Sequence, residues 1–250
     1  MIMPKVRADQ LLVARGLAQS RERAKAMLLA GHVDVGGVRV TKAGALVDDA
    51  AEITLRHADH PWVGRGGIKL AHALDVFELD VTNIRALDIG ASTGGFTDVL
   101  LQRGADRVVA LDVGHNQIDW KLRTDPRVVV IEGINARHLQ PDALPEGLRT
   151  FDVITIDVSF ISLAHIWPVL LALLAADGHV VALVKPQFEA GRTEVGAGGI
   201  VRDPAIHARV IEEVSASAVQ VGLTPLRTVP SPVTGAEGNQ EFLMLLARSR

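Results

Sequence analysis

Two hydrophobic patterns divide the chain. From residue 84 onward, short apolar runs alternate with longer stretches of helical spacing. The predicted strands are Ala86–Ile89, Val108–Val113, Val128–Glu132, Val153–Asp157, Val180–Val184 and Phe242–Ala247. The predicted helices are Ile68–Phe77, Gly95–Arg103, Leu163–Ala176 and Pro204–Val221. Nearly continuous apolar strands between helices indicate a mostly parallel α/β sheet covered on both faces, with ligands bound at the carboxyl ends of its strands.

The first part of the chain has a different pattern. Ala8–Arg15 and Arg21–Ala30 have helical spacing, and the alternating residues 32–40 turn at Gly36 and Gly37 as in a β-hairpin. The segment HADHPWVGRGG that follows breaks both periodicities and is typical of a joint between domains. We therefore expect three regions: a small α+β domain over residues 1–59, a linker over residues 60–67, and the α/β domain over residues 68–250.

The composition is that of an ordinary globular protein, and it excludes several kinds of site. The 250 residues are 48% hydrophobic and 22% charged, and there is no cysteine. Disulfides, thiolate zinc sites and cysteine nucleophiles are thereby excluded, and no metal site is predicted. The longest apolar run, Ile166–Ala176, is too short to span a bilayer and contains Pro168. No secretory signal is visible, so we expect a cytoplasmic protein that does not enter a membrane.

The charge is distributed unevenly. The whole chain has a net charge of −3, whereas residues 1–42 hold eight Lys and Arg against three Asp and Glu, a net charge of +5. A basic segment on an acidic body indicates a polyanion partner. On charge alone, a solvated helix surface fits equally well.

The basic segment also carries a motif. Its residues follow the pattern R-x-D-x-x-L-x-x-x-G-x-x-x-S-R and then G-x-V-x-V-x-G, which resembles the S4 domain, an RNA-binding module. The resemblance implies that one set of basic and hydroxyl side chains faces RNA phosphates, where counterion release favours binding. The expected RNA-binding residues are Arg7, Arg15, Ser20, Arg21, Arg23, Lys25 and, in the linker, Arg65.

A glycine-rich turn follows the first strand of the α/β domain, in the sequence LDIGASTGGF. A phosphate-binding P-loop would need a lysine where Phe96 stands, and a dinucleotide fingerprint would need a glycine where Ser92 stands. S-adenosylmethionine has no phosphate and fits better, with Asp88 meeting its ammonium group and Asp112 its ribose hydroxyls. Asn135 would approach the adenine or lie as an ordinary surface residue. The expected cofactor-binding residues are Asp88, Gly90, Ser92, Gly94, Gly95, Phe96, Asp112, Asn135 and Asp157.

The residues after the fourth predicted strand narrow the range of atoms that could accept the methyl group. Methyltransferases that act on the adenine amino group usually carry Asn/Asp-Pro-Pro-aromatic at this place, whereas this chain reads Asp157-Val-Ser-Phe160. Methylation at carbon 5 of a pyrimidine needs a cysteine nucleophile, and the chain has none. Both absences favour an oxygen or a ring nitrogen as the acceptor.

Four charged residues supply positive evidence for oxygen. Lys69 precedes the sheet, Asp157 and Lys185 end strands, and Glu241 opens the last strand. This order matches the Lys–Asp–Lys–Glu tetrad of the FtsJ-like 2'-O-methyltransferases. The segment DIGASTGGF also resembles the first motif of these enzymes. A ribose hydroxyl is a weak acid, so its oxygen needs a base. Lys185 is the predicted base, with Lys69 and the two carboxylates orienting it and tuning its charge.

The chain resembles one family over nearly its whole length. The S4-like segment with WVGRGGIKL, DIGASTGGF, DVSFISL, KPQFE and GNQEF is similar to the TlyA family, also called hemolysin A. The resemblance implies a class I (Rossmann-like) methyltransferase with a seven-stranded, mostly parallel sheet and a small S4-like domain. It also implies methylation of cytidine 2'-hydroxyls in ribosomal RNA, within one or both ribosomal subunits.

Two alternatives and one unknown accompany this reading. A catalytically weak RNA-binding factor for ribosome assembly would share the fold and the S4 domain. A pore-forming hemolysin, which the family label suggests, lacks support because no spanning helix is visible. Monomer and homodimer remain equally open.

Overall fold

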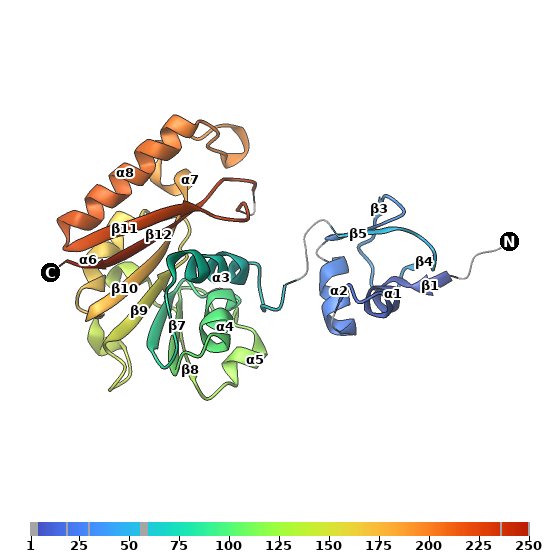
Figure 1. Ribbon diagram of the computed structural model, residues 1–250, viewed down its shortest axis with the longest axis horizontal. Coiled ribbons are helices and arrows are strands. Elements are labelled where there is room, and N and C mark those ends of the chain that lie inside the picture. Colours follow the sequence, from blue (N-terminus) through green and yellow to red (C-terminus); the bar gives the residue numbers. More distant parts are fainter. Residues whose placement is uncertain (1–4, 19, 30, 56–59, 236, 250) are drawn as a thin grey trace. The chain divides into compact units, whose positions relative to one another are not determined.

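The computed structural model describes residues 5–18, 20–29, 31–55, 60–235 and 237–249. The chain divides into two compact units, Met1–Pro61 and Trp62–Arg250 (Figure 1). We describe each unit by itself.

Unit 1 is a small α+β domain. Its elements are β1 (Lys5–Arg7), α1 (Ala8–Ala14), α2 (Arg21–Leu29), β2 (Val33–Val35), β3 (Val38–Arg39), β4 (Leu46–Asp48) and β5 (Ile53–Leu55). Strand β1 pairs with β4, and the β2–β3 hairpin is extended by β5. Leu12, Ala24, Leu28 and Val33 form the centre of its core. The two predicted helices and the hairpin are confirmed, except that Ala30 and residues 56–59 lie outside the described residues.

Unit 2 is built around one large sheet. Its strands are β6 (Arg85–Ile89), β7 (Arg107–Asp112), β8 (Val128–Glu132), β9 (Phe151–Ile156), β10 (Leu174–Val184), β11 (Leu223–Pro230) and β12 (Phe242–Arg248). Its α-helices are α3 (Gly66–Phe77), α4 (Gly95–Gln102), α5 (Trp120–Arg123), α6 (Trp167–Leu170), α7 (Pro186–Glu189) and α8 (Pro204–Gln220). Its 3₁₀ helices are η1 (Ala136–His138), η2 (Pro141–Ala143), η3 (Leu163–His165) and η4 (Ala197–Gly199).

The strand order explains where a ligand can bind. The seven strands lie in the order β11-β12-β10-β9-β6-β7-β8, and β12 is antiparallel to both of its neighbours. The other pairings are parallel, so the expected seven-stranded, mostly parallel sheet is confirmed. The chain runs outward from β6 to β8 and then returns to the other side of β6. This reversal between β6 and β9 is a topological switch point, beside which open α/β sheets bind ligands.

Helices cover both faces of the sheet. On one face, Leu87 and Ile89 of β6 pack in a core that includes Trp167 and residues of α8. On the other face, Ala86 of β6 packs in a core with Leu70 of α3 and residues of α4. Neighbouring residues of one strand therefore enter opposite cores, which is why the strands are apolar throughout.

Two sequence predictions for unit 2 are wrong. The structure replaces the expected helix over 163–176 by η3, the short α6 and the extended start of β10 at Leu174. Pro168 lies in the first turn of α6, where a missing N–H is tolerated, and this prevents one continuous helix from η3 onward. Strand β11 was not predicted, because Pro225 and Pro230 disguise it; proline is tolerated there since the strand lies at the sheet edge.

Residues 62–67, six of the eight residues of the expected linker, are part of unit 2. Trp62 and Val63 pack against the core of α3 and α4, and α3 begins at Gly66. A side chain on Gly67 would lie within 2.4 Å of the Trp62 ring, so the glycine permits this packing. Residues 62–67 therefore belong structurally to the larger unit.

Candidate active site

A cavity of 1060 Å³ opens at the switch point of the sheet. The residues that line it follow five consecutive parallel strands, and they include Gly90, Asp112, Asn135, Asp157 and Phe188. Single-ligand pockets typically measure about 300–1,000 Å³. The cavity is therefore large enough for a cofactor together with part of a second molecule.

The glycine turn closes tightly against strand β9. Gly90 has a φ of 82°, and a Cβ atom there would lie 2.3 Å from the Asp157 carbonyl oxygen. Ser92, which occupies the position of a fingerprint glycine, also has a positive φ, of 50°. Its N–H donates to Asp112 Oδ2 at 2.8 Å, which holds this less favourable backbone conformation in place. The turn thus brings the ends of β6, β7 and β9 together around the cavity.

Asp112 lies where the sequence predicts a ribose-binding acid. It ends β7 and lines the cavity. Its Oδ1 accepts the Gly114 N–H at 2.7 Å, as its Oδ2 accepts the N–H of Ser92. Each oxygen keeps a further lone pair, so the carboxylate is fixed in orientation and can still accept hydrogen bonds from a ligand.

Asp88 differs from the expectation. It is fully buried, it does not line the cavity, and it accepts hydrogen bonds from Thr97 Oγ1 at 2.7 Å and Thr155 Oγ1 at 2.9 Å. Burial raises the pKa of Asp88 to about 6. The carboxylate therefore braces β6, α4 and β9 beneath the glycine turn, and its influence on a ligand would pass through that turn. The two threonines were not identified from the sequence.

Three other predicted cofactor residues also lie away from the cavity lining. Gly94 is the N-cap residue of α4, Gly95 and Phe96 begin the helix, and Phe96 is buried in the core shared with α3. A Cβ atom on Gly95 would lie 2.9 Å from the Gly67 nitrogen, so the glycine allows α3 and α4 to approach closely. By contrast Asn135 lines the cavity, where its Oδ1 also caps η1 through the Arg137 N–H at 3.0 Å.

The predicted tetrad forms two lysine–carboxylate pairs. Lys185 Nζ lies 2.6 Å from Asp157 Oδ1 and donates to Ser159 Oγ at 2.9 Å. The first contact has the distance of an ion pair without the alignment of a hydrogen bond, so Asp157 Oδ1 has no hydrogen-bond partner among the described residues. Asp157 and Ser159 both line the cavity. The Lys185 amine therefore lies one contact behind the cavity wall.

The second pair is closed off from solvent. Lys69 Nζ donates to Glu241 Oε2 at 2.5 Å, and both residues are buried. A Cβ atom on Gly235 would lie 2.5 Å from Glu241 Oε1, so the β11–β12 loop covers this carboxylate only because glycine stands there. Helix α3, which carries Lys69, begins beside the first pair, since a Cβ on Gly66 would lie 4.0 Å from Asp157 Oδ2.

Two aromatic residues that the sequence reading did not single out stand beside Lys185. Phe160 is 90% exposed and has a φ of 64°, and its ring centroid lies 4.9 Å from that of Phe188. Lys185 Nζ lies 5.9 Å from the centroid of the Phe188 ring. Both phenylalanines line the cavity. The available signal was an aromatic residue three positions after Asp157 and again three positions after Lys185.

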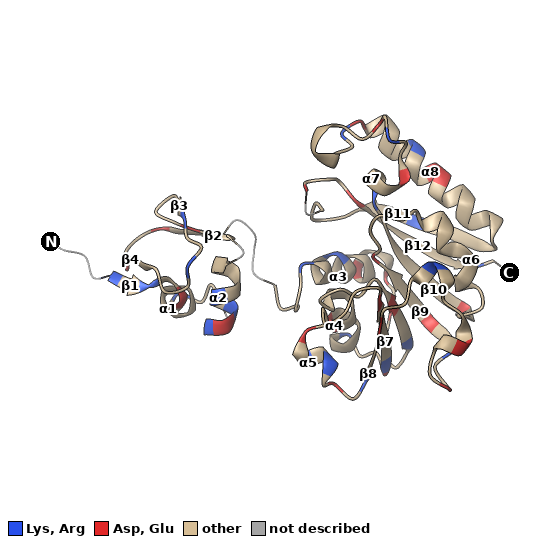
Figure 2. Cartoon of the chain, turned by 180° about the vertical axis from the view of Figure 1, so that it is seen from behind, with Lys and Arg blue, Asp and Glu red and all other residues tan. Residues whose placement is uncertain are grey.

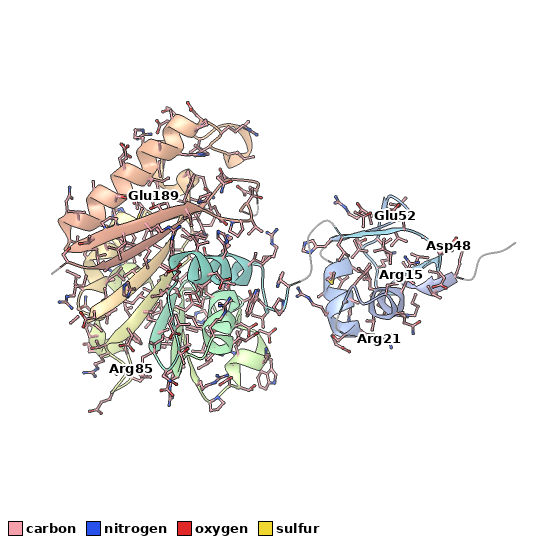
Figure 3. All side chains as sticks on the ribbon, viewed as in Figure 1. Arg15, Arg21, Asp48, Glu52, Arg85 and Glu189 are labelled. Carbon is pink, nitrogen blue, oxygen red and sulfur yellow. The ribbon has the colours of Figure 1, made fainter. Side chains whose placement is uncertain are left out.

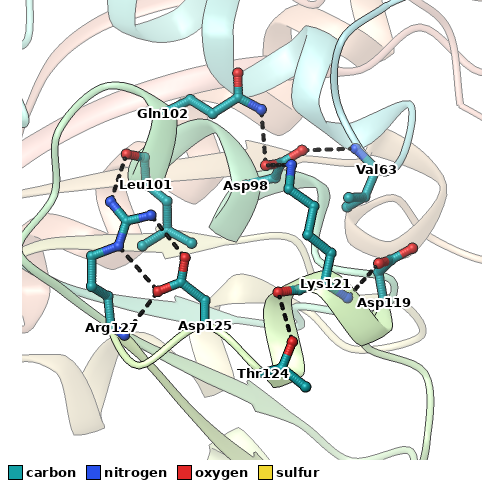
Figure 4. A network of polar contacts seen from close by, with 9 residues as sticks. All are labelled: Val63, Asp98, Leu101, Gln102, Asp119, Lys121, Thr124, Asp125 and Arg127. Atoms are coloured by element: carbon teal, nitrogen blue, oxygen red, sulfur yellow. Dashed lines mark hydrogen bonds and ion pairs between the residues drawn. The ribbon is translucent and has the colours of Figure 1, made fainter. Parts of the chain in front are cut away.

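A buried carboxylate anchors the segment that precedes α3. Asp98 of α4 accepts the Val63 N–H at 2.9 Å and Gln102 Nε2 at 2.9 Å, and Lys121 Nζ of α5 lies 3.4 Å away (Figure 4). This network ties the entry to α3, which carries Lys69, to the helix that follows the glycine turn. It thereby fixes the surroundings of the site rather than the cavity itself.

The predicted RNA-binding residues of unit 1 are arranged around one acid. Arg7 makes two hydrogen bonds to Asp9, at 2.9 Å each, and Arg21 makes a third at 3.2 Å. The pKa of the Asp9 carboxyl is held well below its usual range by these two guanidinium groups. Basic residues lie along β1 and α2, where Figure 2 shows them in blue. Because both guanidinium groups stay partly exposed, Asp9 orients them without hiding them.

The other predicted RNA-binding residues have mixed environments. Arg15 donates to the backbone carbonyls of Asp49 and Ala51, which gives it a structural task within unit 1 (Figure 3). Ser20 caps α2 by accepting the Arg23 N–H at 3.1 Å. Three other predicted residues are placed as follows: Arg23 contacts His60, and Lys25 and Arg65 are exposed.

The comparisons with known proteins agree with the sequence resemblance. A model of the FtsJ-like methyltransferase family matches residues 62–248, and a model of the S4 domain matches residues 6–53. None of the described helices has the length and apolar character that crossing a bilayer requires.

Relatives match nearly the whole chain. The 16S/23S rRNA (cytidine-2'-O)-methyltransferase TlyA of Mycobacterium tuberculosis (strain CDC 1551 / Oshkosh) is 45% identical over 97% of this chain and 90% of its own length. Hemolysin A of Brachyspira hyodysenteriae is 41% identical over 95% of this chain and 98% of its own length. A solved structure from Streptococcus thermophilus, named as a hemolysin, is 48% identical, covers 99% of this chain and 90% of that chain, and has a TM-score of 0.77. The chain therefore belongs to the TlyA (hemolysin A) family of FtsJ-like methyltransferases.

Proposed function

We propose that this chain transfers a methyl group from S-adenosylmethionine to the 2'-hydroxyl of a cytidine in ribosomal RNA. One observation carries the proposal. Asp157 lines a large cavity at the switch point of the sheet, and Lys185 meets it at 2.6 Å directly behind the cavity wall. A related methyltransferase that acts on cytidine 2'-oxygens supports the choice of acceptor.

The cavity has the groups that S-adenosylmethionine needs. Asp112 offers acceptors for ribose hydroxyls, and the Asp157 carboxylate, which lines the cavity, can meet a positive charge. Leu111, Val113 and Ile134 supply an apolar surface against which an adenine can lie. Gly90 leaves the backbone bare where the methionine part would pass. The residues present therefore fit this cofactor.

The chemistry then depends on a base and on the charge that it acquires. When bound, S-adenosylmethionine would supply a methyl group activated by its sulfonium, and the neutral thioether S-adenosylhomocysteine would be the leaving group. In its neutral form, the Lys185 amine would take the proton of the ribose hydroxyl, which makes that oxygen nucleophilic. Asp157 would stabilise the ammonium that forms, and the hydrogen bond to Ser159 would orient the amine. Each of these groups is fixed before the substrate arrives, which reduces the reorganisation needed in the transition state.

Lys69 and Glu241 have a supporting part. Their buried hydrogen bond of 2.5 Å joins α3 to the residue before β12 and holds the Lys69 side chain in place. This pair braces the site without exchanging a proton with the substrate.

Unit 1 would hold the RNA. Its oriented pair Arg7 and Arg21, together with the exposed Lys25, offers positive charge for phosphate oxygens. A protein that modifies ribosomal RNA in this way would work in the cytoplasm, on ribosomal subunits or their precursors.

Methyl transfer to ribosomal RNA tests the proposal. Ribosomal subunits from a strain that lacks this gene are incubated with the protein and S-adenosylmethionine carrying a labelled methyl group, and the label is mapped. The proposal requires label on the 2'-oxygen of a cytidine. Tight RNA binding without any label would favour an assembly factor, and leakage of liposomes without label would favour a hemolysin.

A further inference from the structure

Two segments of unit 2 enclose the Lys185 amine. The first, the β9 loop, comprises residues 157–163 and contributes Asp157, Ser159 and Phe160. The second, the α7 segment, comprises residues 185–190 and contributes Lys185 and Phe188. The contacts of Lys185 with Asp157 and Ser159, and the contact between the phenylalanine rings, all join these two segments.

Glu189 joins the same two segments at a different place. Its Oε2 accepts Ser162 Oγ at 2.6 Å, and its Oε1 accepts the Leu163 N–H at 2.9 Å. The Ser162 hydroxyl also accepts the Ala164 N–H at 3.2 Å and caps η3. Both oxygens of the carboxylate are therefore engaged with the end of the β9 loop. We call these two hydrogen bonds the Glu189 bridge; the residue is labelled in Figure 3.

The Glu189 carboxylate is half-buried. Burial raises the pKa of Glu189, because removing a carboxylate from water disfavours its charged form. Hydrogen bonds from Ser162 and Leu163 and the charge of His165 oppose this effect. Glu189 does not line the cavity and has no place in the proton transfer. An apolar residue would cost less to bury, so its hydrogen bonds are the property that a carboxylate adds.

We propose that Glu189 is a positioning residue of the methyl-transfer site. By fixing the far end of the β9 loop to the α7 segment, the Glu189 bridge sets the distance between Asp157 and Lys185 and the contact of Phe160 with Phe188. Without the bridge, the loop is held to the α7 segment mainly by the contacts of Lys185 with Asp157 and Ser159 and by the contact between the two phenylalanine rings. These residues form the site where the substrate would bind. Misplacement of a reacting group by about 1 Å can cost a factor of about 100 in rate.

This inference rests on the proposed function, and its test uses methyl transfer by the full chain. The single-turnover rate is measured with saturating S-adenosylmethionine and ribosomal subunits, together with the dissociation constant of the cofactor. Glu189→Ala is expected to lower the rate by about 10- to 100-fold while cofactor affinity changes less than about twofold. Glu189→Gln keeps one acceptor oxygen and should recover part of the loss. Glu213→Ala, which removes an exposed glutamate paired with Arg209 on α8, serves as the matched control and should keep the wild-type rate.

A double-mutant cycle separates the bridge from a general loss of structure. Ser162→Ala should slow transfer in the wild-type background and have little further effect in Glu189→Ala, because the two residues share one hydrogen bond. A purely structural role would reduce the folded fraction and leave the rate per cofactor-bound molecule unchanged. If Glu189→Ala does not fold, Glu189→Gln and Ser162→Ala decide the matter alone.

The outcomes are distinct. An active wild-type chain whose rate per cofactor-bound molecule is unchanged by Glu189→Ala, or by both milder variants, overturns the positioning role and leaves the proposed function standing. An inactive wild-type chain overturns the proposed function itself. A selective loss of rate with additive effects of Ser162→Ala and Glu189→Ala would also count against the bridge.

Discussion

The two lysine–carboxylate pairs of unit 2 use the same chemical groups in opposite ways. Both lysine side chains are 11% exposed, whereas the carboxylate side chains are 22% exposed in Asp157 and 3% in Glu241. Lys69 makes an aligned hydrogen bond to Glu241, and Lys185 approaches Asp157 without one. Of the two acids, only Asp157 lines the cavity. One pair is thus closed and satisfied, and the other is left open to a substrate.

The topology of the sheet accounts for this difference. Asp157 and Lys185 follow parallel strands beside the switch point, where the sheet leaves a crevice. Glu241 precedes the antiparallel strand β12 and is covered by the loop that contains Gly235. The role of each lysine therefore cannot be read from its residue type alone. It depends on the direction of the strand beside its partner carboxylate and on whether a loop covers that carboxylate.

The largest expected effect is on the open pair. Lys185→Ala should lower the single-turnover rate of methyl transfer by about 10³-fold, the range that a general base contributes. Affinity for S-adenosylmethionine and for RNA should stay nearly constant, because the amine acts mainly in the transition state. Calorimetry on the same variant measures both affinities. A variant that binds neither ligand would mean that Lys185 holds the site together instead.

The closed pair should matter more for stability. Glu241→Ala leaves Lys69 buried without its partner, and breaking a buried pair costs roughly 3 kcal/mol in the free energy of unfolding. Methyl transfer should fall less than in Lys185→Ala. Asp157→Ala is the matched variant, and denaturant unfolding should show a smaller loss for it because this carboxylate is more exposed. Equal losses of stability would remove the distinction between the pairs.

The cofactor side of the cavity gives a third test. Asp112→Ala removes a carboxylate that lines the cavity, and hydrogen bonds to a charged group contribute about 1.5–3 kcal/mol. We expect S-adenosylmethionine to bind at least about tenfold more weakly, with the lysine pairs unaffected. Unchanged affinity in calorimetry would remove Asp112 from the cofactor site.

The smallest effect is a pH dependence beneath the glycine turn. The pKa of Asp88 is raised to about 6 in the folded chain from 3.8, so the folded chain holds a proton that the unfolded chain has lost between these values. Stability from this group is therefore lost as pH rises through 6. Between pH 5 and pH 8 the wild type should lose about 1 kcal/mol more than Asp88→Asn, which carries no such proton. Parallel stability curves for the two proteins would contradict the raised pKa.

The sequence predicted the elements and the strand ends well, because both follow from local patterns. Apolar runs locate six of the seven strands of the large sheet, and motif order singles out Lys69, Asp157, Lys185 and Glu241. It did not predict the contact between Lys69 and Glu241. Lys69 and Glu241 lie 172 positions apart, and their contact depends on how the last strands pair with the sheet.

Other features were missed because they depend on burial rather than on pattern. Asp88 was expected at the ligand but lies under two threonines, since its strand position points it into the space between β6, α4 and β9. Glu189 is the last residue of the KPQFE motif, yet only the fold shows that its carboxylate reaches Ser162. Strand β11 was missed because its prolines are acceptable only at an edge, which the sequence does not reveal.

The most direct test of the account compares Lys185→Arg with Lys69→Arg in one measurement, the single-turnover rate of methyl transfer to ribosomal RNA. Arginine keeps a positive charge but does not give up its proton at usable pH. The account predicts that Lys185→Arg is nearly as inactive as Lys185→Ala, whereas Lys69→Arg keeps most of the rate because its task is that of a fixed charge. Retention of most activity by Lys185→Arg would contradict the account: the open pair would then supply only charge, and another group would remove the proton.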